Sequence, residues 1–352
     1  MGMTTKPLAH SLAREEWEGV CAEWGFPKFR ASQIWQGLHV ALAETWDAVR
    51  GLPADLRGKL KAAYDLNALE VVEKTGTGAR KFLLKCRDGN YVEAVLIPSS
   101  GRNTLCVSSQ VGCAFGCAFC ASGAKGCERD LEAGEIVAQA VVASRLLRHE
   151  GAALGRPENV VVMGMGEPFA NYNAVFKALR ILNAADGLNI GARHITVSTC
   201  GVVPGIERMA GEGMQIELSV SLHAPCNELR SRLMPVNKRW PLEALLAACR
   251  AYTEKTGRVI TFEYTLVAGV NDSPRHAREV AKLLRGTRGR VNLIPLSPVE
   301  GFAGAAPTPR ACADFLRELE RAGLNATLRQ SRGGEVDAAC GQLRLRRGAD
   351  LQ

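Results

Sequence analysis

The sequence predicts an α/β fold in which a parallel sheet curls toward a partial barrel. From about residue 102 onward, seven strand-like runs alternate with amphipathic helices, and repeated βα units of this kind form parallel sheets. Small and polar residues also collect where several of these strands end. Because the carboxyl ends of the strands carry the site in βα barrels, both observations favour a partial barrel over an open sheet.

The segment before the barrel reads as helical, because apolar residues such as Trp17 and Trp24, and later Trp35 and Leu38, recur at helical spacing. Strand-like runs follow, with a hairpin turn at Asp88-Gly89-Asn90. We therefore expect four parts in chain order: a small helical domain that is an RNA-binding accessory (1–66), a short β-hairpin connector (67–101), the core domain (102–346) and a basic tail (347–352).

Composition narrows the class of protein. The chain has 352 residues, 47% of them hydrophobic, which is enough for a large core. No apolar run approaches the roughly 20 residues that span a bilayer, and no signal core follows the first methionine, so we expect a cytoplasmic protein without a membrane partner. The 12 cysteines should then be thiols or ligands. A net charge of +8 favours a polyanion such as RNA, although many ordinary enzymes are equally basic.

Three cysteines are the most informative feature of the chain. Cys113, Cys117 and Cys120 follow the pattern C-x3-C-x2-C, and soft thiolates select an iron–sulfur cluster or zinc. Three cysteines without a nearby partner pair suit a [4Fe–4S] cluster with one open iron. The spacing resembles that of the radical S-adenosylmethionine (SAM) enzymes. A closed four-ligand cluster, a zinc site and three unrelated core cysteines are the alternatives.

The ends of four predicted strands supply a second candidate site. One polar strand end means little, because strands commonly end in Gly, Ser or Asn, but four on one rim favour a ligand site. His223 alone could also be a core histidine whose hydrogen bonds are satisfied. The candidate ligand-binding residues at these ends are Gly166, Glu167, Ser198, Ser221, Leu222, His223 and Asn292.

Seven motifs occur in the order TLCVSSQVGC, VVMGMGEP, HITVSTCGVVP, SVSLHAP, ITFEYTLVAGVND, VNLIP and DAACGQL. In these motifs, over about residues 27–346, the chain resembles the RlmN/Cfr family of radical-SAM enzymes, which methylate adenine carbons in RNA. The resemblance implies a partial (βα)6 radical-SAM barrel. Pro168 in GMGEP favours the branch of the family that acts at adenine C2 over the branch that acts at C8.

The resemblance also implies roles for the cofactor-binding residues. The three cysteines of the triplet would bind the cluster, and SAM would chelate its open iron. Gly166 and Glu167 would hold the amino end of SAM, while the candidates at the other strand ends would hold the rest. Two SAM molecules would be used in each turnover, one as methyl donor and one as radical source.

Three further residues would perform the reaction on the base. By resemblance, Cys340 in DAACGQL would carry the methyl group, Cys106 would be its disulfide partner, and Glu93 would be the proton acceptor. Without the resemblance, Cys106 reads as core filler, Cys340 as a free cysteine after a turn and Glu93 as a solvated strand residue. Whether Cys106 or Glu93 removes the C2 proton stays open.

The implied products are 2-methyladenosine in 23S rRNA and in tRNA, at the adenosine 3′ of the anticodon. The implied partners are these RNAs and an electron donor such as flavodoxin or ferredoxin. One alternative is formation of 8-methyladenosine on 23S rRNA. An alternative of another class is a non-catalytic iron–sulfur electron-transfer or RNA-binding protein, for which Cys340 would be dispensable.

This chain departs from the family at three cysteines. Cys127, Cys200 and Cys226 replace other residue types, and Cys127 could in principle close the cluster as a fourth ligand, although a packed or surface thiol is favoured. Residue-level support for RNA binding is weaker, because each basic residue alone reads as a solvated charge. The candidates for phosphate contacts are Arg193, Arg230, Arg232, Lys238, Arg239, Arg329, Arg332, Arg344, Arg346 and Arg347.

Overall fold

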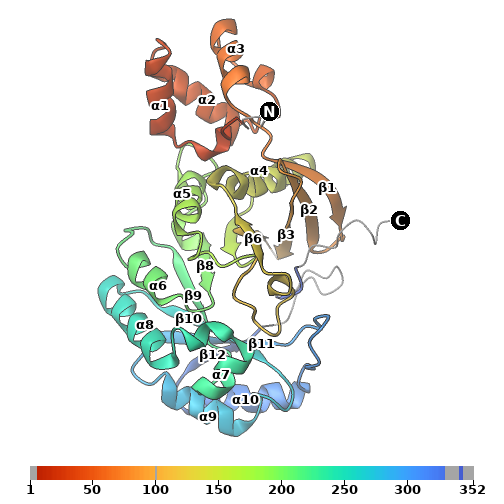
Figure 1. The fold of residues 1–352 in the computed structure, drawn as a ribbon, viewed down its shortest axis with the longest axis vertical. Coiled ribbons are helices and arrows are strands. Elements are labelled where there is room, and N and C mark those ends of the chain that lie inside the picture. Colours follow the sequence, from red (N-terminus) through yellow and green to blue (C-terminus); the bar gives the residue numbers. More distant parts are fainter. Residues whose placement is uncertain (1–5, 100, 330–340, 344–352) are drawn as a thin grey trace.

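The computed structural model describes residues 6–99, 101–329 and 341–343, and one ten-stranded sheet runs through most of them (Figure 1). In spatial order its strands are β1 (Leu69–Thr75), β2 (Arg80–Cys86), β3 (Tyr91–Ser99), β4 (Arg102–Cys106), β7 (Asn159–Val162), β8 (Ile195–Thr199), β9 (Glu217–Ser221), β10 (Ile260–Leu266), β11 (Gly289–Pro295) and β12 (Asn325–Leu328). A separate two-stranded sheet contains β5 (Gln110–Gly112) and β6 (Cys127–Asp130).

From β4 to β12 every neighbouring pair of strands is parallel, and a helix connects each strand to the next. Six βα units followed by a last strand confirm the predicted partial barrel. All seven residues of β10, which has a parallel neighbour on each side, are buried, as expected for a parallel strand that is covered on both faces. The helices are α4 (Ala133–His149), α5 (Tyr172–Asn183), α6 (Val203–Met209), α7 (Asn227–Leu233), α8 (Leu242–Thr256), α9 (Pro274–Leu283) and α10 (Pro309–Arg321).

The β-rich segment before the barrel differs from the expected connector. Strands β1 to β3 are antiparallel, and β3 pairs with β4 so that Val95 lies opposite Cys106. The segment that links the N-terminal helices to the barrel therefore also extends the barrel sheet. Strand β1 forms the outer edge, is exposed along most of its length, and carries a bulge between Val71 and Glu73.

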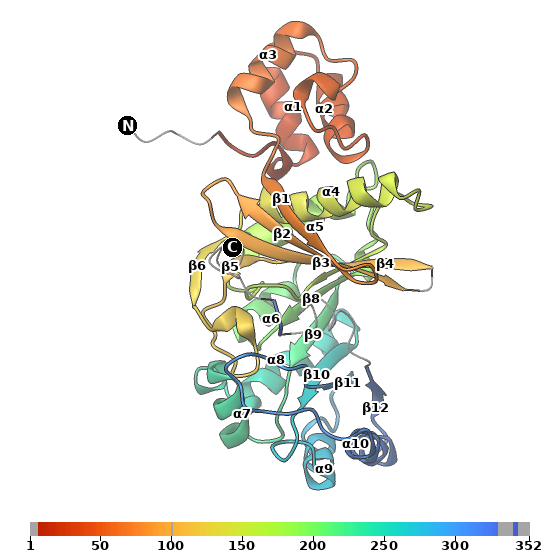
Figure 2. The same cartoon turned by 90° about the vertical axis from the view of Figure 1, so that its right-hand side faces the viewer.

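The N-terminal helices form a compact group beyond α4, as Figure 2 shows. An ion pair joins Glu16 to Lys177 of α5 at 2.7 Å, and Arg145 of α4 donates to the carbonyl of Ala43 at 2.8 Å. Within the described residues, no helix has both the length and the apolar character needed to cross a membrane. The N-terminal helices are α1 (Arg14–Glu23), α2 (Phe29–His39) and α3 (Ala54–Ala63).

Candidate active site

The cysteine triplet lies in a loop between β5 and β6, residues 113–126, which we call the cluster loop. Its base is closed by the amide of Cys113, which donates to the carbonyl of Gly126 at 2.9 Å. Gly112 sits at the same point with φ +79°, and a Cβ there would lie 2.1 Å from the Gly126 oxygen. Only glycine fits this close approach, so the base of the loop is specified by backbone geometry.

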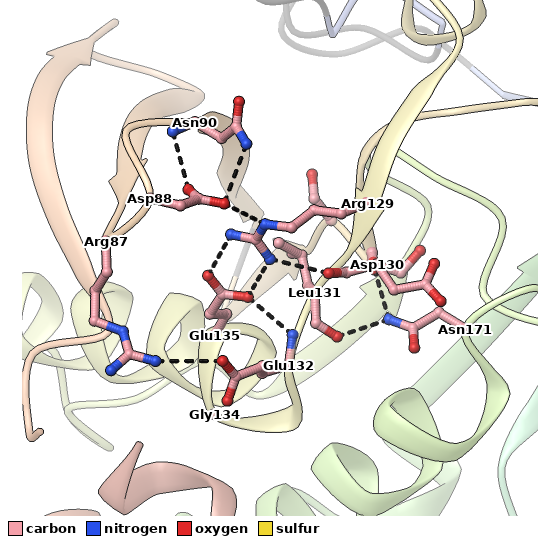
Figure 3. Close-up of polar contacts among 12 residues, drawn as sticks. Arg87, Asp88, Asn90, Arg129, Asp130, Leu131, Glu132, Gly134, Glu135 and Asn171 are labelled. Carbon is pink, nitrogen blue, oxygen red and sulfur yellow. Dashed lines mark hydrogen bonds and ion pairs between the residues drawn. The ribbon is translucent and has the colours of Figure 1, made fainter. Parts of the chain in front are cut away.

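Charged side chains anchor the return strand of the loop (Figure 3). Both terminal nitrogens of Arg129 in β6 donate to the carboxylate of Glu135 in α4, each at 2.8 Å, and Arg129 also pairs with Asp88 in the β2–β3 turn. Glu135 is only 2% exposed. The amide of Asn171 adds hydrogen bonds of 2.8 Å to the carbonyls of Ser109 and Leu131. The cluster loop is thereby fixed to the connector, α4 and the strand end before α5.

The three cysteines of the triplet line one cavity of about 170 Å³, together with residues at the strand ends of the barrel. The sequence prediction placed these two groups in one site, and the structure brings most of them together. The predicted cofactor-binding residues that line the cavity are Gly166, Glu167, Ser198, Ser221 and His223.

Two predicted cofactor-binding residues are not among those that line this cavity. Leu222 is completely buried, and its backbone carbonyl accepts a hydrogen bond from Arg230. Asn292 donates its amide to the carboxylate of Glu263 at 2.8 Å. Asn292 therefore positions Glu263, which does line the cavity. Cys127 is also absent from the described cavity wall, although it begins β6 directly opposite Gly112.

Without a bound metal, the thiols of the cysteine triplet are unfavourable sites for the negative charge of a thiolate. Burial raises the pKa of Cys113 to about 12, with a further rise from Cys120, and burial likewise raises the pKa of Cys117. Within the described part of the chain, no three His, Cys, Asp or Glu side chains are grouped to hold a single metal ion. A set of soft, mutually repelling thiolates around one cavity fits an iron–sulfur cluster, because bound iron supplies the missing positive charge.

Glu167 is a buried carboxylate with prepared hydrogen bonds. Its oxygens accept from the amides of Phe169 at 3.0 Å and Cys200 at 2.7 Å, and its own amide donates to Gln110 at 2.7 Å. Burial raises its pKa, and the two amide donors oppose that rise. Because it lines the cavity beside the thiols, this carboxylate can accept hydrogen bonds from a cationic group of a ligand.

His223 adopts φ 55°, a left-handed conformation that non-glycine residues rarely take. Its Nδ1 accepts from the amide of Thr265 at 2.8 Å, so the neutral ring carries its proton on Nε2. Burial, with a contribution from Arg230, lowers its pKa to about 3. The ring also packs edge-on against Phe119 at 4.8 Å, and it lines the cavity rather than the core alone.

Glu93 and Cys106 lie on neighbouring strands, β3 and β4. Because Val95 faces Cys106, Glu93 and Cys106 are diagonal neighbours on the same face of the sheet. Glu93 is only 3% exposed and pairs with Lys81 at 3.2 Å, so it is not the solvated strand residue that the sequence left as an alternative. Neither residue is among those lining the cluster cavity.

Cys340 lies outside the described residues, but the residue bonded to it does not. Gly341 lines the cavity, and its carbonyl accepts from the amide of Ala121 in the cluster loop at 2.7 Å. Two residues further on, the carbonyl of Leu343 accepts from the Ser122 hydroxyl at 2.7 Å. The end of the DAACGQL motif is therefore attached to the cluster loop.

Two charged residues of the cavity wall were not predicted as part of this site: Glu263, and Arg329, which was a candidate for phosphate contacts. Glu263 lines the cavity from β10, and burial raises its pKa. Its position within a fully buried strand is an unusual place for a carboxylate, and this was the available signal. Arg230 was expected to contact phosphates, and that prediction is wrong, because its side chain is 0% exposed.

A larger cavity of about 770 Å³ lies at the opposite ends of β10 and β11, where Arg278, Arg285 and Arg288 line it. It contains none of the cysteines or strand-end residues described above. The smaller cavity holds the thiols, the buried carboxylates and the neutral histidine, so chemistry rather than size locates the candidate site.

Comparison with known proteins agrees with this geometry. Residues 107–282 match the family model described as the Radical SAM superfamily. The chain is 47% identical over 343 residues to the "Probable dual-specificity RNA methyltransferase RlmN" of Halalkalibacterium halodurans, covering 97% of this chain and 94% of the relative. It is 48% identical over 339 residues to the protein of the same name from Symbiobacterium thermophilum, covering 95% and 90%.

Among solved structures, a radical SAM methyltransferase from Sphaerobacter thermophilus superimposes with a TM-score of 0.93 at 46% identity, covering 96% of this chain and 99% of that one. Similarity of sequence and of structure thus extends over nearly the whole chain, and includes the cluster loop and the strand ends. The chain therefore belongs to the RlmN family of radical SAM methyltransferases.

Proposed function

We propose that the chain methylates RNA, forming 2-methyladenosine in 23S rRNA and in tRNA at the adenosine 3′ of the anticodon. The observation that carries the proposal is the shared cavity: the cysteine triplet, Glu167 and Gly341, the residue bonded to Cys340, all line it. The RNA substrates are supported by the names of the relatives. Flavodoxin or ferredoxin is the proposed class of electron donor.

Cys113, Cys117 and Cys120 would hold the [4Fe–4S] cluster that the family implies. SAM would lie against Gly166, Glu167 and the other strand ends. When bound, cluster and SAM together supply an organic radical that can remove a hydrogen atom from an unactivated methyl group. The buried walls described above would keep water away from this chemistry.

The remaining steps use the chain's own thiols. The Cys340 thiolate would take a methyl group from SAM by displacement, because adenine C2 is too electron-poor to attack a sulfonium itself. After the carbon of that group has joined C2, the adduct would have to lose one electron, which the cluster could accept, and C2 its proton. Cys106 would then attack the Cys340 sulfur; the sulfur–carbon bond breaks, its electron pair and a proton go to the carbon to complete the methyl group, and a disulfide remains. A cellular thiol would then reduce the disulfide. Cys106 or Glu93 would remove the C2 proton, and two SAM molecules would be used.

The test is an anaerobic reaction of reconstituted protein, SAM and a reductant with RNA from a strain that lacks adenine methylation. The RNA is digested, and mass spectrometry identifies its nucleosides. A 2-methyladenosine peak that disappears in Cys340→Ala but persists in the exposed control Cys226→Ala is the expected result. An 8-methyladenosine peak would refute the C2 assignment, and a Cys340→Ala enzyme that still methylates would refute the thiol route.

A further inference from the structure

Arg230, in the short helix α7, carries a positive charge that is completely buried. Its Nη2 donates to the carbonyls of Cys200 at 2.8 Å and Ser221 at 2.9 Å. Its Nε donates to the carbonyl of Leu222 at 3.2 Å, and its Nη1 to the side-chain oxygen of Asn237 at 3.0 Å. All four acceptors are neutral. Among the ion pairs of the described residues, none involves this guanidinium.

The surroundings of Arg230 are built to accept it. Gly201 adopts φ +110°, and a Cβ at this position would lie 2.9 Å from Nη2. The four hydrogen bonds satisfy most of the five N–H donors of the Arg230 guanidinium. All four acceptors are uncharged oxygens, however, so the positive charge of the guanidinium is not neutralised. A buried cation without a counter-ion is strongly unfavourable, so this arrangement calls for a negative partner.

Two of the carbonyls that accept hydrogen bonds from Arg230 belong to Cys200 and Ser221, which line the cluster cavity. The ionisable groups around Arg230 are the thiols of Cys117, Cys200 and Cys249 and the neutral ring of His223. Cys117 and Cys200 line the cluster cavity, whereas Cys249 is buried in the core. The positive charge therefore lies directly behind the part of the cavity wall that Cys200 and Ser221 form.

We propose that Arg230 is the internal counter-charge of the iron–sulfur cluster and raises its reduction potential. This inference rests on the proposed function, in which the cysteine triplet holds a [4Fe–4S] cluster. Reduction adds one electron to the cluster and no proton to the protein, so a fixed positive charge in a dry environment stabilises the reduced form more than the oxidised form. Arg230 acts through the cluster, and is a positioning residue rather than a catalytic one.

Arg230 also ties the ends of β8 and β9 to α7, and this mechanical role must be separated from its charge. Arg230→Gln removes the charge, whereas Arg230→Lys keeps the charge with fewer hydrogen bonds. Asn237→Ala removes the acceptor at Nη1 and also the hydrogen bonds that the Asn237 amide donates to Asn227 and Ser231, and it leaves the charge in place, so it measures the effect of packing alone. Asn237→Asp keeps the guanidinium but places a buried carboxylate against Nη1, and the negative charge of that carboxylate offsets the positive charge of Arg230. Arg232→Gln, on the exposed side of the same helix, controls for net charge.

The experiment measures iron content and then titrates the reconstituted cluster by electron paramagnetic resonance against solution potential. At a fixed potential we expect the ratio of reduced to oxidised cluster to fall about tenfold in Arg230→Gln, a shift of about 59 mV for a one-electron couple. Asn237→Asp should shift in the same direction. Arg230→Lys, Asn237→Ala and Arg232→Gln should stay near the wild-type ratio.

Unchanged ratios in Arg230→Gln and Asn237→Asp would overturn the proposal. So would an Asn237→Ala shift as large as that of Arg230→Gln, because the cause would then be packing. If Arg230→Gln takes up no cluster, Asn237→Asp decides alone. A wild-type protein that binds no iron would instead refute the proposed function, so the two failures are distinguishable.

Discussion

Replacing Arg129 by methionine tests whether the charged anchor holds the cluster loop in place. The substitution removes both hydrogen bonds to Glu135 and leaves that carboxylate, 2% exposed, with the 2.8 Å hydrogen bond from the amide of Glu132. Breaking a buried ion pair by removing one partner costs 3–5 kcal/mol. Because the Arg129 side chain is 29% exposed, we expect the lower end, about 3 kcal/mol.

The loss should be local to the β5–β6 hairpin, and hydrogen-exchange mass spectrometry can follow it there. A loss of about 3 kcal/mol corresponds to amide exchange roughly 150-fold faster in peptides that contain Cys113, whose amide closes the loop. The double variant Arg129→Met/Glu135→Gln should lose less local stability than the sum of the losses in the two single variants, because each single variant already breaks the same ion pair. The anchoring role of Arg129 would be refuted if amide exchange in Arg129→Met were unchanged, or if the stability lost in the double variant equalled the sum of the two single losses. Arg285→Met, an exposed arginine, is the control.

Three further predictions concern the cluster loop and the residues that anchor it. Gly112→Ala should lower the iron content, because its Cβ would lie 2.1 Å from the Gly126 oxygen, on top of a backbone strain of about 1–3 kcal/mol. Gly116→Ala has comparable strain at φ +60° but open space around the Cβ, so it should retain more iron. Asp88 should stabilise the fold by roughly 1 kcal/mol at pH 7, as the difference in unfolding free energy from Asp88→Asn. Burial raises its pKa, but the hydrogen bonds from Arg129 and Asn90 together outweigh burial and lower the pKa to about 2. The contribution is therefore present above pH 4 and lost as the pH falls through 2, and a difference that persists below pH 2 contradicts this. Cys127→Ser should keep the full iron content, and a loss equal to that of Cys117→Ser would make Cys127 a ligand.

Most of the fold could be predicted because local patterns and tertiary structure agree. The run over Ile260–Leu266 is rich in β-branched and aromatic residues, and it forms the fully buried strand β10. The turn at Asp88-Gly89-Asn90 appears as expected, with Gly89 at φ +86°. The pairing of β3 with β4 could not be predicted, because periodicity shows which residues form strands but not which strands become neighbours.

The candidate site was predictable where ligands are close in sequence, and less so where contacts are distant. The C-x3-C-x2-C spacing and the polar strand ends identified the three cysteines and five of the seven strand-end candidates in the cavity wall. Arg230 was misassigned because arginine is normally exposed, and its four acceptors come from residues 200, 221, 222 and 237. Only the folded chain brings those oxygens around one guanidinium.

The antiparallel extension of the sheet also determines how the molecule meets other copies of itself. A parallel sheet that stopped at β4 would present an open row of unpaired backbone groups, and such rows recruit strands from other chains. Strands β1 to β3 cover that row and move the free edge outward to β1. There Glu70, Glu73 and Lys74 place charges along the edge, and the bulge between Val71 and Glu73 interrupts its regular spacing. The extension thus covers the β4 edge of the barrel while it holds Glu93 and Cys106 on adjacent strands, and β12 is the edge on the other side.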